Sequence, residues 1–388
     1  MDTIEGIIPQ SKDFVMGNEA CAYGAIAAGC RFVAGYPITP SGEILNLLAK
    51  LLPRVNGVFI QMEDEIASIA ACIGASWTGK KVLTATSGPG FSIMTENLGY
   101  AFMTETPMVI INTQRAGPSQ GQAGKAGQGD VMQARFGSHG DYEIIALSPK
   151  NAEECFGLTI QAFNLAEQYR TPVILLSDAV IAHLRETVDF SSINKYNIID
   201  RKRPRTPEQA RRPFDPSDKD LIPPMPLLGE GNNLLVTGST HTPDGVRETV
   251  DRIIHEQLIR RLHDKVNSNR SEIEMYEETF TDNCDVLAIS YGAPSRPTQG
   301  AVTRLQQEGY AIGFFRPIVL WPSPEKRMNE LSYQVKRVYL VEMSIRGYRI
   351  EIERVFGSDK VHHISKLSEV HTSQEIYEEI KIDMRKHL

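Results

Sequence analysis

The chain has few cysteines and none in a metal-binding arrangement. Its 388 residues include five, which are Cys21, Cys30, Cys72, Cys155 and Cys284. No two of them have the Cys-x-x-Cys spacing that is common in zinc and iron–sulfur sites. We therefore expect the cysteines to be small buried apolar residues in a reducing compartment, and we expect no metal ion or cluster to be held by this chain alone.

Long apolar runs and an excess of basic charge are also lacking. No stretch approaches the roughly 18 consecutive apolar residues of a membrane span. The opening residues, MDTIEGIIPQSKDF, lack the basic and apolar regions of a secretory signal. The net charge of −7 argues against nucleic acid as the main partner. We therefore expect a cytoplasmic protein without a membrane or nucleic-acid partner, long enough for two domains.

Residues 18–180 alternate strand-like and helix-like segments. The expected strands are short and rich in apolar residues: Arg31–Tyr36, Val58–Gln61, Lys81–Thr86, Met108–Asn112, Glu143–Leu147 and Val173–Leu176. The expected helices lie between them: Glu19–Ala28, Glu43–Leu51, Glu65–Trp77, Ser92–Thr104 and Ala152–Gln168. Because strands buried on both faces are typical of parallel sheets, the pattern predicts a doubly wound α/β domain at residues 1–190.

Proline interrupts this pattern after residue 190. The segment Ile222-Pro223-Pro224-Met225-Pro226 is one example, and such a density of proline excludes a regular helix or a central strand. We expect residues 191–232 to form a surface linker whose basic run, Arg201–Arg205, is solvated; contact with an acidic partner is the alternative. Strand–helix alternation resumes afterwards and predicts a second, smaller α/β domain at residues 233–388.

Two polar segments follow expected strands near the start of the chain. In Tyr36-Pro37-Ile38-Thr39-Pro40, the Thr39 hydroxyl could bind a substrate carboxylate or carbonyl, or Thr39 could cap the next helix. In Glu63-Asp64-Glu65, three acids open a helix, although capping needs only one or two of them. That helix carries no charge between Ile66 and Trp77, so we expect it to be buried nearly all round.

Two further segments complete the set of candidates. Thr86-Ser87-Gly88-Pro89-Gly90 links a strand to a helix, and its glycines allow a backbone to approach a ligand closely. Arg115 ends the next strand and is followed by a glycine-rich loop that reaches Asp130. Arginine matches a carboxylate through two parallel hydrogen bonds. The alternative for Arg115 is an ion pair with Asp130 or another nearby carboxylate.

Together these four segments resemble the pyrimidine-binding domain of thiamine-diphosphate enzymes. In that superfamily a glutamate opens a helix of small residues and a glycine follows nine positions later, as Glu65 and Gly74 do here. The Tyr36–Pro40 segment resembles that of 2-oxoacid:ferredoxin oxidoreductases. Similarity to their alpha subunits extends over nearly the whole chain, and the pattern is most similar to the 2-oxoglutarate (2-oxoglutarate synthase) type. The resemblance implies that the second domain is like the C-terminal domain of transketolase.

The resemblance also implies an activity and its residues. Glu65 would hydrogen-bond the aminopyrimidine ring of thiamine diphosphate as the catalytic residue, and Thr39 and Arg115 would hold the 2-oxoacid. The remaining cofactor contacts would come from Ser87, Gly88, Pro89 and Gly90. The reaction would convert 2-oxoglutarate to succinyl-CoA and CO₂ with reduction of ferredoxin, or the reverse. Branched-chain, aromatic or pyruvate substrates are the alternatives, as is a transketolase-like transfer.

One motif of thiamine-diphosphate enzymes is missing from the sequence. They bind Mg²⁺ and the diphosphate through Gly-Asp-Gly followed by an asparagine, and this chain has no such motif. The family resemblance implies that a beta subunit supplies the diphosphate and Mg²⁺ site together with an iron–sulfur cluster, and that coenzyme A, ferredoxin and possible gamma and delta subunits are further partners. Relatives often read Pro-Ser-Thr-Gly after the arginine, where this chain has Pro118-Ser119-Gln120-Gly121.

Overall fold

Two mostly parallel β-sheets organise the chain, whose structure, a computed structural model, describes residues 6–216 and 219–387. The first sheet has the order β13-β7-β8-β5-β4-β2-β3, with β6 paired to β5. Its strands are β2 (Cys30–Gly35), β3 (Val58–Gln61), β4 (Lys81–Thr86), β5 (Met108–Ala116), β6 (Gln122–Ala126), β7 (Ile145–Leu147), β8 (Pro172–Asp178) and β13 (Val319–Trp321). All six predicted strands are present, and they pair in parallel.

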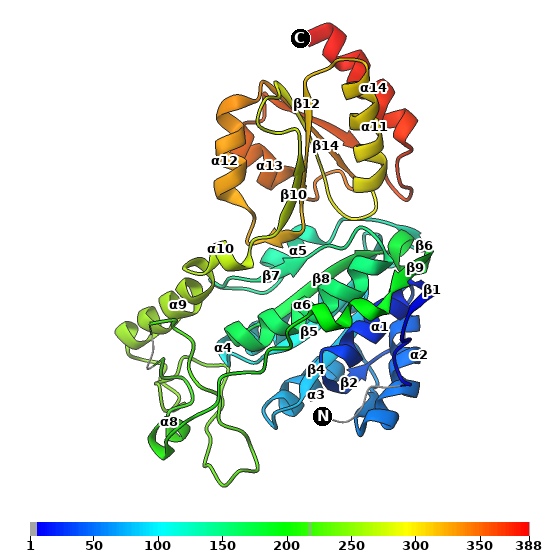
Figure 1. The fold of residues 1–388 in the computed structure, drawn as a ribbon. Coiled ribbons are helices and arrows are strands. Elements are labelled where there is room, and N and C mark those ends of the chain that lie inside the picture. The colour runs from blue at the N-terminus through cyan, green and yellow to red at the C-terminus, as the bar shows by residue number, and fades with distance from the viewer. Residues whose placement is uncertain (1–5, 217–218, 388) are drawn as a thin grey trace.

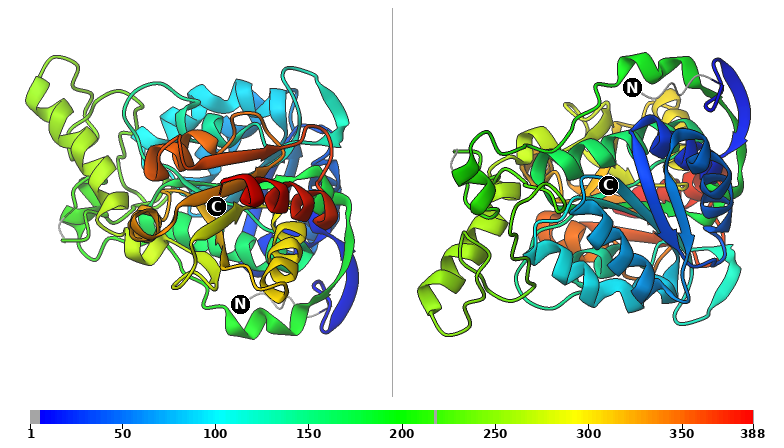
Figure 2. Two further views of the ribbon diagram at one scale, coloured as in Figure 1. Left: turned by 90° about the horizontal axis from the view of Figure 1, so that it is seen from above. Right: turned by 90° about the horizontal axis from the view of Figure 1, so that it is seen from below.

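Apolar residues on both faces of these strands create two cores. In β5, Val109 and Ile111 belong to one hydrophobic cluster, while Ile110 belongs to the other. Helices cover both faces (Figures 1 and 2): α1 (Gly17–Ala27), α2 (Gly42–Leu51) and α6 (Ala152–Tyr169) on one, and α3 (Glu65–Ser76) and α4 (Gly88–Met103) on the other. The doubly wound α/β fold is therefore confirmed, because alternating side chains must be buried on each face.

Shorter elements join these layers. They are η1 (Leu52–Val55), α5 (Val131–Phe136), α7 (Ala179–His183), η2 (Phe190–Lys195), and the antiparallel pair of β1 (Lys12–Met16) and β9 (Arg185–Asp189). All five cysteines are buried, as predicted. None of the helices in the described part of the chain is long and apolar enough to cross a membrane.

The second sheet stands above the first in Figure 1 and has the order β10-β12-β11-β14-β15. Its strands are β10 (Tyr276–Thr279), β11 (Val286–Ser290), β12 (Ile312–Pro317), β14 (Arg337–Glu342) and β15 (Val361–Ser365). Four helices flank it: α11 (Ser295–Gln307), α12 (Glu325–Gln334), α13 (Arg349–Phe356) and α14 (Ser373–His387). The predicted second α/β unit is therefore confirmed. One strand from this half of the chain, β13, joins the first sheet beside β7 instead.

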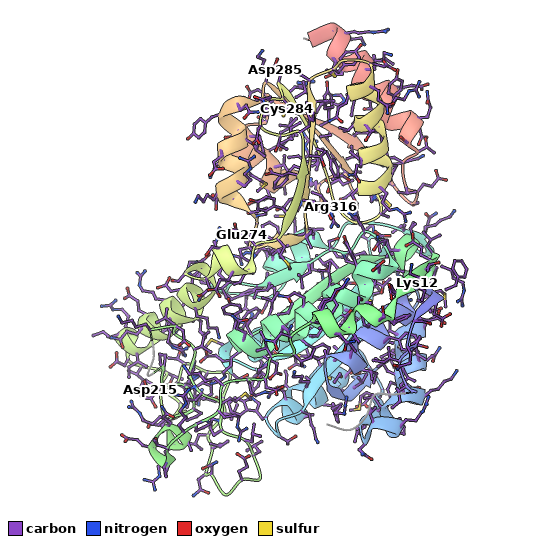
Figure 3. All side chains as sticks on the ribbon, viewed as in Figure 1. Lys12, Asp215, Glu274, Cys284, Asp285 and Arg316 are labelled. Atoms are coloured by element: carbon purple, nitrogen blue, oxygen red, sulfur yellow. The ribbon has the colours of Figure 1, made fainter. Side chains whose placement is uncertain are left out.

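A buried arginine ties the two units together. Arg316 at the end of β12 lies near their boundary in Figure 3, and its side chain is fully buried. Its Nη2 lies 2.7 Å from Glu154 Oε1 on α6, and its Nε lies 3.0 Å from Glu277 Oε2 on β10. Two carboxylates therefore offset the cost of burying the guanidinium.

The segment that links the two units along the chain includes α8 (Pro207–Arg211), α9 (Arg252–Asn267) and α10 (Arg270–Ile273). The predicted solvation of its basic run is wrong for Arg201, which is 5% exposed. Arg201 Nη2 lies 2.6 Å from Glu167 Oε1, and its Nη1 donates to the Ser76 carbonyl. The run looks like a solvated charge cluster in the sequence because the partner, Glu167, lies on a distant helix.

The expectation that α3 is buried nearly all round is also wrong. Ile66 is 48% exposed, and Ala70 and Gly74 are exposed on the same side of the helix. These positions are four residues apart and form one stripe, which we call the open α3 face. Only the opposite side of α3 packs on the sheet, so an uncharged helix surface is left uncovered in this chain.

A buried charge cluster fastens α9 to the first sheet. Glu105 is fully buried, and its carboxylate lies 2.6 Å from Arg261 Nη2 and 2.8 Å from Lys265 Nζ. Burial by itself raises the pKa of Glu105, but the charges of Arg261 and Lys265 outweigh it and hold the pKa well below its usual range. The ionised carboxylate thus compensates two cations, one of which, Lys265, is almost fully buried.

Replacing Glu105 should therefore destabilise the chain severely. In Glu105→Ala the Lys265 ammonium remains buried without its carboxylate, and we expect the free energy of unfolding to fall by about 3–5 kcal/mol. Because the folded-state pKa is depressed, the stabilisation is present above the unfolded pKa and should be lost as the pH falls through the folded pKa. Urea denaturation measures both effects. Glu256→Ala, which breaks the exposed Arg252–Glu256 pair, is the control and should change stability by less than about 1 kcal/mol; an equally small change in Glu105→Ala would contradict the assignment.

Candidate functional site

The candidate residues gather at the carboxyl ends of the strands of the first sheet. Glu65 follows β3, the Thr86–Gly90 turn follows β4, and Arg115 lies near the end of β5. These strands are parallel, so their carboxyl ends meet at one edge, where α/β proteins bind ligands. The glycine turn between β4 and α4 lies between the acid and the arginine, because Gly90 packs on Glu65 while Gly88 packs near Arg115.

Glu65 is not needed to cap its own helix. The Asp64 carboxylate accepts a hydrogen bond from the Ala67 backbone N–H at 2.8 Å and is the N-cap of α3. Glu65 is 5% exposed, and apart from Glu65 itself none of the described residues donates a hydrogen bond to its carboxylate. Burial raises the pKa of Glu65, and the neighbouring Asp64 charge adds to the increase. The result is a spare acid that can keep a proton more readily than a solvated glutamate.

The turn after β4 fits closely around this acid. A Cβ atom on Gly90 would lie 2.2 Å from Glu65 Oε1 and 2.3 Å from Thr86 Oγ1, so only glycine leaves the carboxylate in place. The Thr86 and Ser87 hydroxyls are buried and have no hydrogen-bond partner among the described residues. Buried polar atoms normally have partners, so these hydroxyls and the free acid fit a polar ring that enters beside the turn.

Arg115 is held by backbone oxygens. Its Nη1 donates to the Thr39 carbonyl at 2.8 Å, and its Nη2 donates to the carbonyl and side chain of Gln120, each at 3.2 Å. Its Nε is buried without a partner, and a Cβ on Gly88 would lie 3.7 Å from it. The structure thus brings Thr39 and Arg115 together, through the Thr39 main chain, while Thr39 as a residue is exposed.

The alternative ion pair between Arg115 and Asp130 is absent. No described carboxylate lies within 4.0 Å of the Arg115 guanidinium nitrogens. Asp130 instead accepts a hydrogen bond from Asn112 Nδ2 at 3.0 Å, and its backbone N–H donates to Gln114 Oε1. Burial raises the pKa of Asp130, although the Asn112 hydrogen bond and the Arg115 charge oppose the increase. Arg115 therefore keeps its net positive charge for a ligand.

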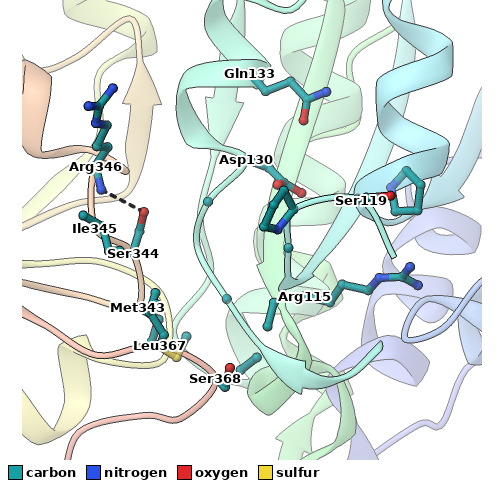
Figure 4. Close-up of a pocket in the computed structure, with 18 of the residues that line it drawn as sticks. Arg115, Ser119, Asp130, Gln133, Met343, Ser344, Ile345, Arg346, Leu367 and Ser368 are labelled. Atoms are coloured by element: carbon teal, nitrogen blue, oxygen red, sulfur yellow. Dashed lines mark hydrogen bonds between the residues drawn. The ribbon is translucent and has the colours of Figure 1, made fainter. Parts of the chain in front are cut away.

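A cavity of about 670 Å³ opens beside Arg115, between the two sheets. Figure 4 shows Arg115, Ser119, Asp130 and Gln133 on one side and Met343–Arg346, Leu367 and Ser368 on the other. Of the candidate residues, Gly88, Pro89 and Arg115 line this cavity, whereas Glu65, Thr39, Ser87 and Gly90 do not. The second wall was not predicted from the sequence; its signal is the Glu342-Met343-Ser344 segment, where a buried strand ends.

Sequence comparison finds two family matches. Residues 23–260 match the family described as pyruvate flavodoxin/ferredoxin oxidoreductase, thiamine diphosphate binding, and residues 284–379 match core domain II of pyruvate:ferredoxin oxidoreductase. The 2-oxoglutarate synthase subunit KorA of Methanothermobacter marburgensis is 48% identical and covers 95% of this chain and 98% of its own. Its counterpart in Methanocaldococcus jannaschii is 47% identical, with 94% and 98% covered. The ketoisovalerate oxidoreductase subunit VorB of Methanothermobacter thermautotrophicus is 32% identical, with 92% and 93% covered.

Structure comparison agrees with the sequence matches. A 2-oxoglutarate:ferredoxin oxidoreductase from Magnetococcus marinus, with 2-oxoglutarate, coenzyme A and succinyl-CoA bound, superposes with a TM-score of 0.91 at 33% identity. The match covers 97% of this chain and 66% of that one. A split-gene transketolase described as an inactive beta4 tetramer has a TM-score of 0.56 at 14% identity and shares the fold.

Two glycines distinguish the packed turn from the open helix. In Gly90→Ala the new methyl group displaces the Glu65 carboxylate, and we expect the isolated chain to lose about 1–3 kcal/mol of stability. In Gly74→Ala no described atom lies within 4 Å of the new Cβ, so helix propensity should add about 0.5–1 kcal/mol of stability. Urea denaturation of both variants compares the two sites, and equal effects would show that the turn is not closely packed on Glu65.

Proposed function

The chain belongs to the 2-oxoacid:ferredoxin oxidoreductase family, and from this premise we propose that it is the alpha subunit of a 2-oxoglutarate-converting enzyme. The enzyme would convert 2-oxoglutarate, coenzyme A and oxidised ferredoxin to succinyl-CoA, CO₂ and reduced ferredoxin, or catalyse the reverse. The observation that carries this proposal is the placement of a spare buried acid, Glu65, and a charged Arg115 on either side of one glycine turn. The acid would match a ring nitrogen of the cofactor, and the arginine would match a substrate carboxylate.

Glu65, Ser87, Gly88, Pro89 and Gly90 would hold the aminopyrimidine half of thiamine diphosphate. When bound, this cofactor supplies the electron sink for decarboxylation. The raised pKa of Glu65 suits a carboxyl group that shares a proton with a ring nitrogen, because a buried acid releases its proton less readily. The unpartnered Thr86 and Ser87 hydroxyls are further donors or acceptors for the ring. These contacts orient the cofactor within this chain.

Arg115 and Thr39 would hold the carboxylate of the 2-oxoacid. The Thr39 carbonyl and Gln120 already fix the guanidinium, so little conformational entropy is lost when a carboxylate binds. The free Nε and the absence of a described acidic partner within ion-pair distance leave the charge available. Substrate identity rests on the relatives: the 2-oxoglutarate synthase subunits KorA are 41–48% identical to this chain, and the ketoisovalerate oxidoreductase subunits VorB are 32–33% identical.

The open α3 face supports a partner subunit on the cofactor side. It begins one residue after Glu65, is uncharged, and contains Gly74, a helix-interior glycine that no described atom crowds. Glycine weakens a helix unless something approaches closely. The proposed occupant is a beta subunit that carries the diphosphate and Mg²⁺ half-site and an iron–sulfur cluster. The described residues contain no group of three or more His, Cys, Asp or Glu side chains placed to hold a metal ion.

The remaining assignments follow from the same proposal. Residues 1–190 would be the pyrimidine-binding domain, 191–232 the linker and 233–388 the transketolase C-terminal-like domain. The complex would be cytoplasmic and would use coenzyme A and ferredoxin, with gamma and delta subunits as possible further partners. Reconstitution with the beta subunit and measurement of viologen reduction test it. We expect turnover with 2-oxoglutarate and coenzyme A to exceed turnover with 2-oxoisovalerate, phenylpyruvate or pyruvate; the reverse order would remove the substrate assignment.

Glu65→Gln tests the acid. The amide keeps the size and can hydrogen-bond, but it cannot exchange a proton with the cofactor ring, so we expect turnover of the assembled complex to fall roughly 10²–10⁴-fold. Glu63→Gln is the matched control, because Glu63 is exposed and two residues away, and its turnover should match that of the unmodified complex. Assembly is checked by gel filtration. Full activity in an assembled Glu65→Gln complex would leave Glu65 without a chemical role.

Arg115→Lys tests the carboxylate site. Lysine keeps the charge but loses the planar pair of donors, so the KM for the 2-oxoacid should rise about ten- to a hundredfold while thiamine diphosphate affinity is retained. Steady-state kinetics and cofactor titration separate the two quantities, and melting temperature shows any loss of loop anchoring. An unchanged KM with a lowered melting temperature would make Arg115 a structural residue only.

A further inference from the structure

A buried amide joins the glycine-rich loop after Arg115 to the second sheet. Gln128 is 1% exposed and lies between β6 and α5. Its backbone N–H donates to the Met343 carbonyl at 3.0 Å, and its Oε1 accepts from the Met343 backbone N–H at 2.8 Å. Its Nε2 donates to the Tyr291 carbonyl at 3.0 Å. One side chain thus satisfies backbone groups that follow two neighbouring strands, β14 and β11, of the second sheet.

The two residues before Gln128 are packed directly on Arg115. Ala126 pairs with Arg115 in the β5–β6 register and forms a bridge with Ser368 of the second unit. A Cβ on Gly127 would lie 2.7 Å from the Arg115 carbonyl oxygen, so backbone meets backbone there. The three successive residues 126–128 therefore connect the backbone of Arg115 to the edge of the second sheet, and the buried Gln128 side chain makes the last contact.

The second sheet approaches Gln128 as closely as a backbone can. Gly292 has φ +60°, and a Cβ there would lie 2.5 Å from Gln128 Nε2. The next residue, Ala293, donates its N–H to Asp178 Oδ2 at 2.9 Å, at the end of β8. Met343, Ala126 and Gly127 all line the cavity beside Arg115. The contact therefore lies in the wall of the site.

From these contacts we propose that Gln128 is a positioning residue for the 2-oxoacid site: it fixes the loop that sets Arg115, so that the second domain controls substrate affinity without contacting the substrate through Gln128. This inference rests on the proposed function. It assigns no role to Gln128 at the pyrimidine site, because Glu65 and Gly90 lie on other segments, β3–α3 and β4–α4. The physical cause is that a buried backbone donor or acceptor without a partner is costly. If the Gln128 side-chain amide is lost, the loop must therefore move so that the Met343 N–H and the Tyr291 carbonyl find other partners.

Gln128→Met is the principal test. Methionine has a similar shape but leaves the Met343 N–H and the Tyr291 carbonyl without partners. In the reconstituted complex we expect the KM for the 2-oxoacid to rise about tenfold, with kcat within about twofold and thiamine diphosphate affinity unchanged. Gln128→Glu keeps the acceptor for Met343 N–H and loses the donor to Tyr291, so it should have an intermediate KM and serves if Gln128→Met does not fold.

Lys150→Met is the matched control. It breaks another contact between the two units, the 2.6 Å pair of Lys150 with Glu277, which does not line the cavity. It should lower the melting temperature without changing the KM.

A second readout does not depend on enzyme activity. Lys125 is exposed on β6, and trypsin should cut after it faster in Gln128→Met than in the control. Unchanged KM and unchanged cleavage after Lys125 would overturn the positioning role. Absence of 2-oxoacid-dependent turnover in the unmodified complex would instead overturn the proposed function, and the cleavage rates would still decide whether Gln128 holds the loop.

Discussion

The close approach of a backbone turn to a buried acid is the constraint on which the site depends. Gly90 leaves room for the Glu65 carboxylate only because it has no side chain, and the carboxylate is thereby kept out of water, which raises its pKa. The same turn begins α4 near Gly88, beside the unpartnered Nε of Arg115. One short segment thus sets the separation between an acid suited to a cofactor ring and a cation suited to a substrate, and both depend on the parallel order β5-β4-β2-β3, which brings their strand ends together.

The second sheet completes what the first begins. A doubly wound sheet offers a ligand an open edge, and here the residues that follow β11 and β14 contact the loop after β5 at that edge. Arg316 and its two carboxylates hold the units together away from the cavity. Near the cavity the contact is made by hydrogen bonds between the buried Gln128 and the backbone of Met343 and Tyr291, which depend on distance and angle. The interface is therefore part of the site's construction as well as a joint between two cores.

The sequence predicted the features that depend on neighbours along the chain and failed where distant residues decide. Strands such as Pro172–Asp178 are apolar throughout, so their burial on both faces could be read directly. The family resemblance proposes roles for Glu65 and Arg115, and the structure adds that Asp64 caps α3 and that Asp130 pairs with Asn112. Arg201 was misjudged because its partner lies on another helix, and β13 was missed because its three residues gain their sheet partner only through tertiary packing. Composition alone could not tell whether α3 is covered by other segments of this chain or left open.

Several features of this chain are unfavourable in the isolated fold and would be relieved by binding. Glu65 is desolvated without an external donor, the Thr86 and Ser87 hydroxyls lack partners, α3 carries an interior glycine, and Ile66 is exposed on an uncharged face. Each is a cost to the isolated fold, and natural chains keep such costs where function needs them. A cofactor ring would satisfy the polar atoms, and a partner on the open α3 face would bury the apolar ones. Because ligands that bind only the folded state stabilise it, the proposed subunit assembly and cofactor binding should each raise the stability of this chain. We expect the two to be coupled, because Glu65 is the first residue of the helix that carries the open α3 face.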